Sequence, residues 1–550
     1  MKIREIRQAY HHLHRYQEIL GVLVKYGLAE WVNRLHLDFA QAILARRVNP
    51  DIAKLPFEVK VRMALTELGP TFIKLGQILS VRPDLVGVAQ SDELTLLQDQ
   101  VPPDPMESVR RVVESELKQP IQDLFQYFDE IPLASASISQ VHRALLKSGE
   151  EVVVKVQREN IQEKIQVDLE ILSDLADLVE KYIEESRPYR PRATVDEFRR
   201  TLLRELDFQR EARYLELFAQ DFADDPTVHI PAVFPEYTTS RVLTMEFLSG
   251  VKLSDREALE KMGIDLSQLA LRGVDIFLRM IFTKGLYHAD PHPGNILILE
   301  GGVIGLIDFG MIGRLDDELR EDVEDLLMAV ATGSGNRLVS VITKIGSPPP
   351  HLNKAALQAD VLDFITYYGN LPLNKVNLGQ ALREMTEVIR RHQILLPASL
   401  AMLLKTLIVM EGTGRLLNPQ FDLLTVIRPY QQRMLSRYLS PRRQFQKMQR
   451  LYWDLERVVQ AVPPGMVEVI QKLRTGEFDL NLNHRGLERL VNRLVFGVIT
   501  AALFLGSALM MSFQVPPLIW GISILGWIAY ILSLLFGIRL LWAIHVSGRL

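Results

Sequence analysis

Residues 285–310 read GLYHADPHPGNILILEGGVIGLIDFG, and this stretch alternates short apolar runs with carboxylate and amide side chains. The apolar runs on either side of Gly301 and Gly302 are joined by residues typical of a tight turn. The pattern therefore predicts a β-hairpin whose open end brings Asn295 close to Asp308.

Three polar side chains in this stretch have the spacing of a protein-kinase catalytic centre. Asp290 precedes Asn295 by five residues, as in the H-R-D-x-x-x-x-N loop, and an Asp-Phe-Gly tripeptide begins thirteen residues later at Asp308. Phosphoryl transfer needs a carboxylate to orient or deprotonate the acceptor, and Asp290 is the candidate. An amide oxygen and a second carboxylate, from Asn295 and Asp308, suit the Mg²⁺ that accompanies ATP.

Each part of the stretch also has a simpler interpretation. Asp-Phe-Gly is a common turn sequence, and Asn295 alone is consistent with the end of a turn. His288 and His292 flank Asp290, and together the three residues offer donors to a metal ion. Hard oxygen ligands for Mg²⁺ explain the rest of the region better, so we favour the kinase-like interpretation.

A second hairpin is predicted upstream. Apolar runs at 145–146 and 152–156 flank a turn sequence at 147–150, and Lys155 interrupts the second run. A lysine in such a strand is either an edge residue whose ammonium reaches water or a buried residue that needs an anionic partner. Strand-type sequence returns at 241–248.

An acidic helix is expected between these strand regions. Apolar residues step by four from Phe198 to Leu206, which predicts one continuous helix over 194–218. Asp207 and Glu211 are four residues apart, so they would share a face of that helix.

Residues 1–125 carry apolar stripes at helical spacing and few glycines, so we expect helices there. One of them begins with Pro70 in its first turn. Lys74 and Gln77 share a face of this helix because they are three residues apart. Gly76 weakens a helix by about 1 kcal/mol relative to alanine, which suggests that something approaches the backbone closely there.

The C-terminal region has the pattern of a membrane hairpin. The stretches 494–513 and 518–538 are uncharged, and each is long enough to cross a hydrocarbon core, which takes about 20 helical residues. The basic residues of the two flanks are Arg485, Arg489, Arg493, Arg539 and Arg549, whereas the connection at 514–517 is uncharged. The positive-inside rule then places the body of the chain in the cytoplasm. The alternative is a helical hairpin buried in a soluble core.

The composition excludes several classes of protein. The chain has 550 residues, of which 48% are hydrophobic and 24% charged, so it can bury a large core. Its formal charge of −4 does not favour nucleic-acid binding. The absence of cysteine excludes disulfides, thiolate metal sites and a catalytic thiol. Residues 1–15 mix charges with apolar residues, so no secretory signal is expected.

These patterns predict an α+β chain in four parts. They are an N-terminal helical extension (1–125), a mixed lobe with an inserted helix (126–250), a helical lobe (251–480) and a two-helix transmembrane hairpin (490–540). The two lobes would form a bilobal protein-kinase-like fold.

The chain resembles the UbiB/ADCK-type atypical kinases of isoprenoid-quinone biology over roughly residues 60–420. Residues 74–77 resemble the K-x-G-Q motif of that family, and 205–207 resemble its E-x-D motif. Lys155 and Glu211 resemble the kinase ion pair between a strand lysine and a helix glutamate. An Ala-rich loop stands where ordinary kinases have glycines (Ala134, Ser135, Ala136 and Ser137), and a hinge that would contact adenine follows later (Met245, Glu246, Phe247 and Leu248).

This resemblance implies that the chain binds ATP and Mg²⁺. The implied roles are catalytic for Asp290, Lys155 and Glu211, Mg²⁺-binding for Asn295 and Asp308, and regulatory for Lys74, Gln77, Glu205 and Asp207. In the family, the K-x-G-Q helix is thought to fold over the active site, where it would occupy the space of a protein substrate. The implied partners are membrane lipids and prenyl-quinone intermediates or their biosynthetic enzymes, and the implied location is the cytoplasmic side of the bacterial inner membrane.

Departures from ordinary kinases have physical consequences. The Cβ atoms of the Ala-rich loop should stiffen it and change how a triphosphate lies beneath it. Ala289 replaces an arginine that commonly receives an activation-loop phosphate, so activation of that type is not expected. The long gap between Lys155 and Glu211 leaves room for an inserted helix that carries Glu205 and Asp207.

Three functions are compatible with these features. We favour a membrane-anchored atypical kinase or ATPase that hydrolyses ATP slowly or in response to lipid and supports the synthesis or mobilisation of prenyl lipids. The alternatives are a conventional protein or small-molecule kinase and a nucleotide-binding pseudokinase scaffold. The scaffold ranks last because Asp290, Asn295 and Asp308 are all present. The sequence carries no signal for the phosphoryl acceptor or the oligomeric state.

Overall fold

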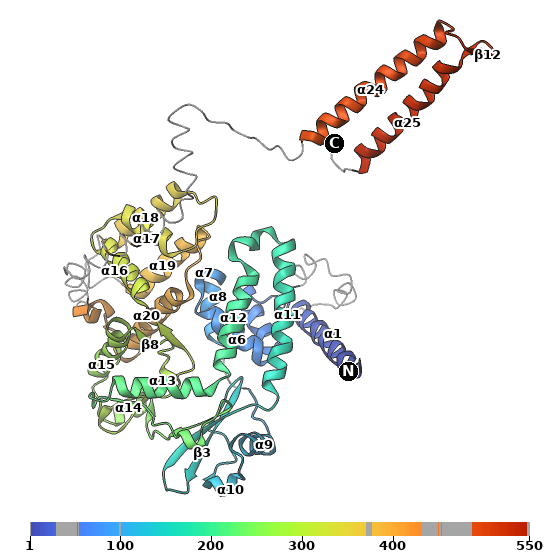
Figure 1. The fold of residues 1–550 in the computed structure, drawn as a ribbon. Coiled ribbons are helices and arrows are strands. Elements are labelled where there is room, and N and C mark those ends of the chain that lie inside the picture. The colour runs from blue at the N-terminus through green and yellow to red at the C-terminus, as the bar shows by residue number, and fades with distance from the viewer. Residues whose placement is uncertain are drawn as a thin grey trace. The chain divides into compact units, whose positions relative to one another are not determined.

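The computed structural model describes residues 2–28, 52, 54–97, 101–369, 377–427, 429–430, 449, 453 and 487–546. It divides the chain into two units, Met1–Arg443 and Gln444–Leu550. The first unit contains the helical extension and the two lobes of an α+β kinase-like fold (Figure 1). The division into four parts stays a prediction.

The N-lobe is built on an antiparallel sheet with the strand order β1-β3-β4-β6, and β2 pairs with β3. The strands are β1 (Phe125–Phe128), β2 (Ala134–Ser135), β3 (Ser139–Leu146), β4 (Glu151–Gln157) and β6 (Val242–Glu246). Strands β3 and β4 pair along their length, which confirms the predicted upstream hairpin. Val152 and Val154 pack in the cluster that includes helix α9 (Met106–Leu117). Val153 and Lys155 face the other way because side chains alternate along a strand.

The segment between β4 and β6 holds the inserted helices. They are α11 (Ile161–Tyr182), the short η2 (Glu184–Tyr189), α12 (Pro191–Glu205) and α13 (Phe208–Asp221). The continuous helix predicted over 194–218 is wrong, because the chain breaks between α12 and α13. Asp207 caps α13 and accepts a hydrogen bond from the Gln209 amide at 3.2 Å. Asp207 therefore lies outside the helix and does not share a helical face with Glu211.

The C-lobe combines short strands with helices. Its strands are β5 (Val228–His229), β7 (Val251–Lys252), β8 (Leu286–His288), β9 (Ile296–Ile298), β10 (Ile304–Leu306) and β11 (Ile312–Arg314). Its α-helices are α14 (Arg256–Lys261), α15 (Leu266–Arg279), α16 (Asp317–Ala331), α17 (Gly335–Ile345), α18 (Lys354–Gly369), α19 (Leu378–Arg391) and α20 (Ala398–Leu417). Strands β9 and β10 pair across Gly301 and Gly302, whose φ angles of 74° and 78° suit glycine. This confirms the predicted downstream hairpin.

The extension is helical, as predicted. Its helices are α1 (Lys2–Lys25), α5 (Phe57–Leu68), α6 (Pro70–Ser80), α7 (Pro83–Val86), α8 (Val88–Thr95), α9, and α10 (Ile121–Leu124). Helix α6 packs against the inserted helices α11 and α12, and α8 packs against α6 and against α19 of the C-lobe. The expected close approach at Gly76 comes from leucines. A Cβ there would collide with Leu97 and lie 3.0 Å from Leu65.

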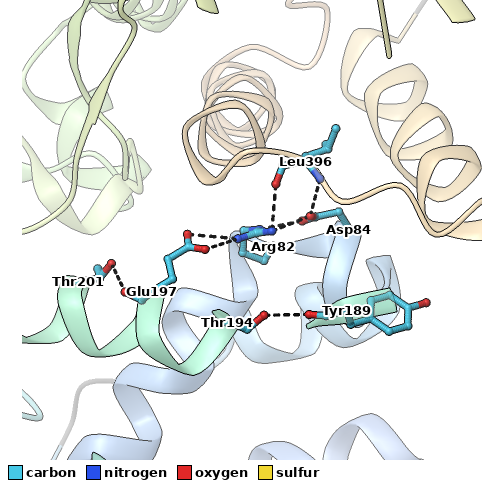
Figure 2. Close-up of polar contacts among 7 residues, drawn as sticks. All are labelled: Arg82, Asp84, Tyr189, Thr194, Glu197, Thr201 and Leu396. Atoms are coloured by element: carbon cyan, nitrogen blue, oxygen red, sulfur yellow. Dashed lines mark hydrogen bonds and ion pairs between the residues drawn. The ribbon is translucent and has the colours of Figure 1, made fainter. Parts of the chain in front are cut away.

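A buried arginine joins the extension to two other parts of the fold (Figure 2). Arg82 lies between α6 and α7, and its guanidinium contacts Asp84 through two hydrogen bonds of 2.8 and 3.0 Å. It also reaches Glu197 of α12 at 3.3 Å and donates to the Leu396 carbonyl at 3.2 Å. The Leu396 amide donates in turn to Asp84 at 3.2 Å. The extension is thus fastened to the N-lobe insertion and to the C-lobe segment before α20.

The second unit contains an antiparallel pair of apolar helices, α24 (Leu487–Ser512) and α25 (Ile524–Val546). Two short strands, β12 (Leu518–Ile519) and β13 (Ile522–Ser523), connect them, so the second helix begins six residues later than the predicted span. The apolar spans are Leu494–Ser512 and Ile524–Trp542, and the second one includes Arg539. Both are long and apolar enough to cross a membrane, and little of either is buried in the described structure. Arg485 and Arg549 lie outside the described residues.

Candidate active site

The predicted ion pair between a strand and a helix of the N-lobe forms at the centre of the site. Lys155 of β4 donates to both carboxylate oxygens of Glu211 on α13, at 2.8 and 2.9 Å. Its ammonium lies 3.7 Å from Asp308 Oδ1 and 5.3 Å from the centre of the Phe208 ring. Burial would lower the pKa of Lys155, but the carboxylates of Asp308 and Glu211 raise it above its ordinary value. Lys155 is therefore a largely buried lysine with anionic partners rather than an edge residue.

The Asp-Phe-Gly segment is held by a hydrogen bond at Asp308 and by the packing of the Phe309 ring. Asp308 Oδ1 accepts a hydrogen bond from the Gly310 amide at 2.9 Å. The Phe309 ring is buried and packs against Phe218 of α13, with ring centroids 5.1 Å apart. The Lys155 ammonium holds the pKa of Asp308 well below its usual range. The carboxylate is thus ionised at neutral pH, and its side chain remains 49% exposed.

The catalytic-loop residues converge as the spacing predicts. The Asn295 amide donates to Asp290 Oδ2 at 2.8 Å, and the Ile307 amide donates to the Asn295 carbonyl at 3.2 Å. The second bond sets Asn295 beside the residue that precedes Asp308. The side-chain nitrogen of Asn295 is engaged with Asp290, and within the described part of the chain its side-chain oxygen accepts no hydrogen bond, so this oxygen can face a cation.

The histidines of this loop have local roles. His288 Nδ1 accepts a hydrogen bond from the Asp290 amide at 3.2 Å, and His292 Nδ1 accepts one from the Gly294 amide at 3.2 Å. Burial lowers the pKa of His288. Among the described residues, no group of three or more His, Asp or Glu side chains is arranged to hold a metal ion. The alternative His-Asp-His metal site is thus not formed there.

The K-x-G-Q helix reaches the same centre. Lys74 of α6 pairs with Glu205 at 2.5 Å, and both side chains are largely buried. Glu205 Oε1 lies 3.9 Å from the position that a Cβ on Gly310 would take. The Lys74 charge also helps to lower the pKa of Asp308. Gln77 is half-buried on the same helix, whereas Asp207 pairs with Arg210 at 3.4 Å beside its capping bond.

The Ala-rich loop is a tight connection between β2 and β3. The Ala136 amide donates to the Ser139 carbonyl at 2.8 Å, and Ala134 and Ser135 pair with β3. The hydroxyls of Ser137 and Ser139 are buried and lack a hydrogen-bond partner among the described residues. They therefore do not cap the turn.

The hinge residues differ in what they face. Met245 is buried beneath the sheet. The Glu246 carboxylate is engaged with His229 Nε2 at 2.9 Å and the Ala232 amide at 3.1 Å. Glu246 and Leu248 line a cavity of about 580 Å³, together with residues from the α13–β5 connection and the β9–β10 turn. The carboxylate of Glu246 therefore makes its hydrogen bonds within the protein.

Sequence reasoning missed several groups that hold the site. Thr406 of α20 donates to the Ala289 carbonyl at 3.0 Å, next to Asp290. Its neighbour Lys405 is buried and donates to Thr95 of α8 at 3.0 Å. Arg158, directly after β4, contacts the Ala-rich loop. Lys405 is a charged residue in an otherwise apolar helical sequence, and this pattern could have identified it. No local sequence feature distinguishes Thr406.

Fold and site together define an atypical kinase-like protein, with a lysine–glutamate pair, a catalytic loop and an Asp-Phe-Gly segment around one centre. Family models match residues 96–342 (ABC1 atypical kinase-like domain), 361–422 (UbiB helical domain) and 479–546 (ABC1/UbiB kinase-like C-terminal domain). The chain belongs to the UbiB family of atypical kinase-like proteins.

The chain is similar to several individual proteins. A probable protein kinase UbiB from Shewanella baltica is 34% identical over 82% of this chain and 82% of its own. An uncharacterized protein in the hydrogenase 1 5' region of Clostridium pasteurianum is 30% identical over 98% of this chain and 100% of its own. The solved structure of Rv3197 with erythromycin, from Mycobacterium tuberculosis, is 25% identical, covers 66% of this chain and 92% of that one, and has a TM-score of 0.44.

Proposed function

We propose that the chain is a membrane-anchored atypical kinase or ATPase that binds Mg-ATP and supports isoprenoid-quinone metabolism. The observation that carries this proposal is the convergence of Lys155, Glu211 and Asp308 beside the Asp290–Asn295 pair. This is the donor set that phosphoryl transfer requires. Membership of the UbiB family supports the link to quinones.

The residues present fit Mg²⁺. Asp308 is an ionised, half-exposed carboxylate, and the side-chain oxygen of Asn295 accepts no hydrogen bond from the residues that the structure describes. Mg²⁺ typically takes one or two such protein ligands and completes its shell with phosphate oxygens and water. When bound, the ion would offset the charge that develops on the phosphates.

The chain's own groups would divide the remaining work. Lys155, fixed by Glu211, offers a cation to the phosphates. Asp290, held by the Asn295 amide at 2.8 Å, orients an attacking hydroxyl or water and accepts its proton. Phe309 packs under α13, so Asp308 and Glu211 keep a fixed relation to Lys155.

We further propose that protein phosphorylation is suppressed. Lys74 and Glu205 form a largely buried pair next to the Asp-Phe-Gly segment. Lys74 belongs to the extension, which is fastened to both lobes, and Glu205 ends the inserted helix α12. A polypeptide acceptor would have to displace this pair. Water and small acceptors would not.

The proposal predicts lipid-stimulated ATP hydrolysis. The uncharged hairpin with arginine flanks should favour anionic bilayers, because basic residues near a membrane surface each contribute about 1 kcal/mol of attraction. We expect phosphate release by the full chain to rise severalfold with vesicles of phosphatidylglycerol and phosphatidylcholine, and less with phosphatidylcholine alone. The Asp290→Asn variant gives the background rate of phosphate release. Robust phosphorylation of generic protein substrates by the wild type, or turnover indifferent to both vesicles, would count against the proposal.

A further inference from the structure

Arg158 makes an unusually complete set of contacts just outside the site. Its side chain is 8% exposed, and it follows Gln157, the last residue of β4. Its Nε donates to the Ala136 carbonyl at 3.0 Å, and its Nη2 donates to Ser135 Oγ at 2.8 Å. The Arg158 amide donates to the Ile138 carbonyl at 3.0 Å. One residue therefore binds the Ala-rich loop at Ser135 and Ala136 and also binds Ile138, which directly follows the loop.

The same guanidinium holds a second segment. Its Nη1 pairs with the Asp104 carboxylate, and Nη2 also donates to the carbonyls of Pro102 at 3.0 Å and Val101 at 3.4 Å. Residues 101–104 lie between α8 and α9 of the extension in the sequence. Arginine suits this position because its planar fork offers five donors in fixed directions.

The two segments are also bonded directly to each other, because the Val101 amide donates to the Ser135 carbonyl at 3.4 Å. The Asp104 amide donates to Gln140 Oε1 of β3 at 2.6 Å, close to the end of the loop. The Ala-rich loop is therefore fastened at its start by residues 101–104 and along its length by Arg158. The glycine-rich loop of an ordinary kinase has a backbone that is free to change conformation, and this loop lacks that freedom.

We propose that Arg158 is a positioning residue for nucleotide binding, which clamps the Ala-rich loop against residues 101–104 in one conformation. This inference rests on the proposed nucleotide site. A loop already ordered in the free protein loses little conformational entropy when ligand binds, so the clamp favours affinity. Arg158 touches none of Asp290, Asn295 or Asp308, so the chemical step should be little affected.

Arg158→Ala should raise the KM for ATP about tenfold and leave kcat within about twofold of the wild type. Arg158→Lys keeps the charge but loses the planar fork, and its KM for ATP should lie between those of the wild type and Arg158→Ala. The matched control is Arg111→Ala. Arg111 of α9 forms a two-point pair with Glu159, the neighbour of Arg158 in the sequence, at 2.9 and 2.7 Å, but it does not touch the loop. The control should leave KM unchanged.

Amide hydrogen exchange on the full chain without nucleotide gives an independent readout. Arg158→Ala should speed exchange at 133–138 and spare β3 and β4, whereas Arg111→Ala should change neither. If the wild type binds no nucleotide, the proposed function fails while this exchange experiment still tests the clamp. Equal exchange and equal KM in Arg158→Ala and Arg111→Ala would overturn the inference.

If Arg158→Ala unfolds the N-lobe, amide exchange will be fast throughout β3 and β4, and Asp104→Asn is then the variant that tests the clamp. This variant keeps the shape and an acceptor for Arg158 but removes the charge. Faster exchange at 133–138 with a raised KM supports the clamp. Wild-type values for both would overturn it.

Discussion

Asp308→Asn should lower ATP turnover by about 10³-fold, an effect comparable to removing a single preorganised charge-stabilising group from an active site. The Lys155 ammonium, 3.7 Å away, keeps the pKa of this carboxylate well below its usual range, so the wild-type group is charged at every physiological pH. Asparagine has the same shape and can still accept the Gly310 amide. It lacks only the charge needed for Mg²⁺. Steady-state phosphate release by the full chain measures the loss.

Asp316→Asn is the matched control. Asp316 caps α16 by accepting from the Leu319 amide at 2.8 Å, and asparagine is an equally good cap. This control should keep wild-type turnover. An Asp308→Asn variant that retained more than about a tenth of it would contradict the assigned role.

Asp84→Ala should reduce the free energy of unfolding by about 3–5 kcal/mol, because it leaves the buried Arg82 guanidinium without its principal partner. The exposed fraction of Arg82 is 8%, and that of Asp84 is close to zero. Burial alone would lower the pKa of Arg82, but Asp84 and Glu197 raise it. Asp84 also accepts from the Leu396 amide, so its loss weakens the junction in Figure 2 at two points. Urea unfolding of the full chain in detergent, followed by far-ultraviolet circular dichroism, measures the change.

Two comparisons isolate the buried charge. Asp177→Ala removes a half-exposed carboxylate that pairs with Arg192 at 2.7 Å, and it should cost less than about 1 kcal/mol. The double variant Arg82→Met with Asp84→Leu removes both charges and should recover part of the loss. If Asp84→Ala were no more destabilising than Asp177→Ala, the junction would not hold the extension in place.

Local sequence was sufficient for the residues that lie close together along the chain. The spacing of Asp290, Asn295 and Asp308, with glycines at the turn, placed all three near one hairpin, and that hairpin exists. Such contacts depend on short-range backbone geometry, which spacing and turn residues encode.

Contacts across the fold could not be predicted in this way. The helix break before α13 overrode an apolar period that continued through Leu206, although Asp207 is a preferred helix cap and was a usable signal. The pairing of Arg82 with the Leu396 carbonyl joins residues more than 300 positions apart, and no periodicity encodes it. Similarly, Gly76 indicated a close approach correctly, but only packing identifies Leu97 as the neighbour.

An equilibrium titration of the full chain with a fluorescent ATP analogue measures whether this site binds one Mg-ATP. We expect saturable binding of one nucleotide per chain, at least about tenfold tighter with Mg²⁺ than with a chelator. The Mg²⁺ enhancement should disappear in Asp308→Asn and persist in Asp316→Asn. No saturable binding, or a Mg²⁺ enhancement that survives Asp308→Asn unchanged, would show that the site is not the proposed Mg-ATP site.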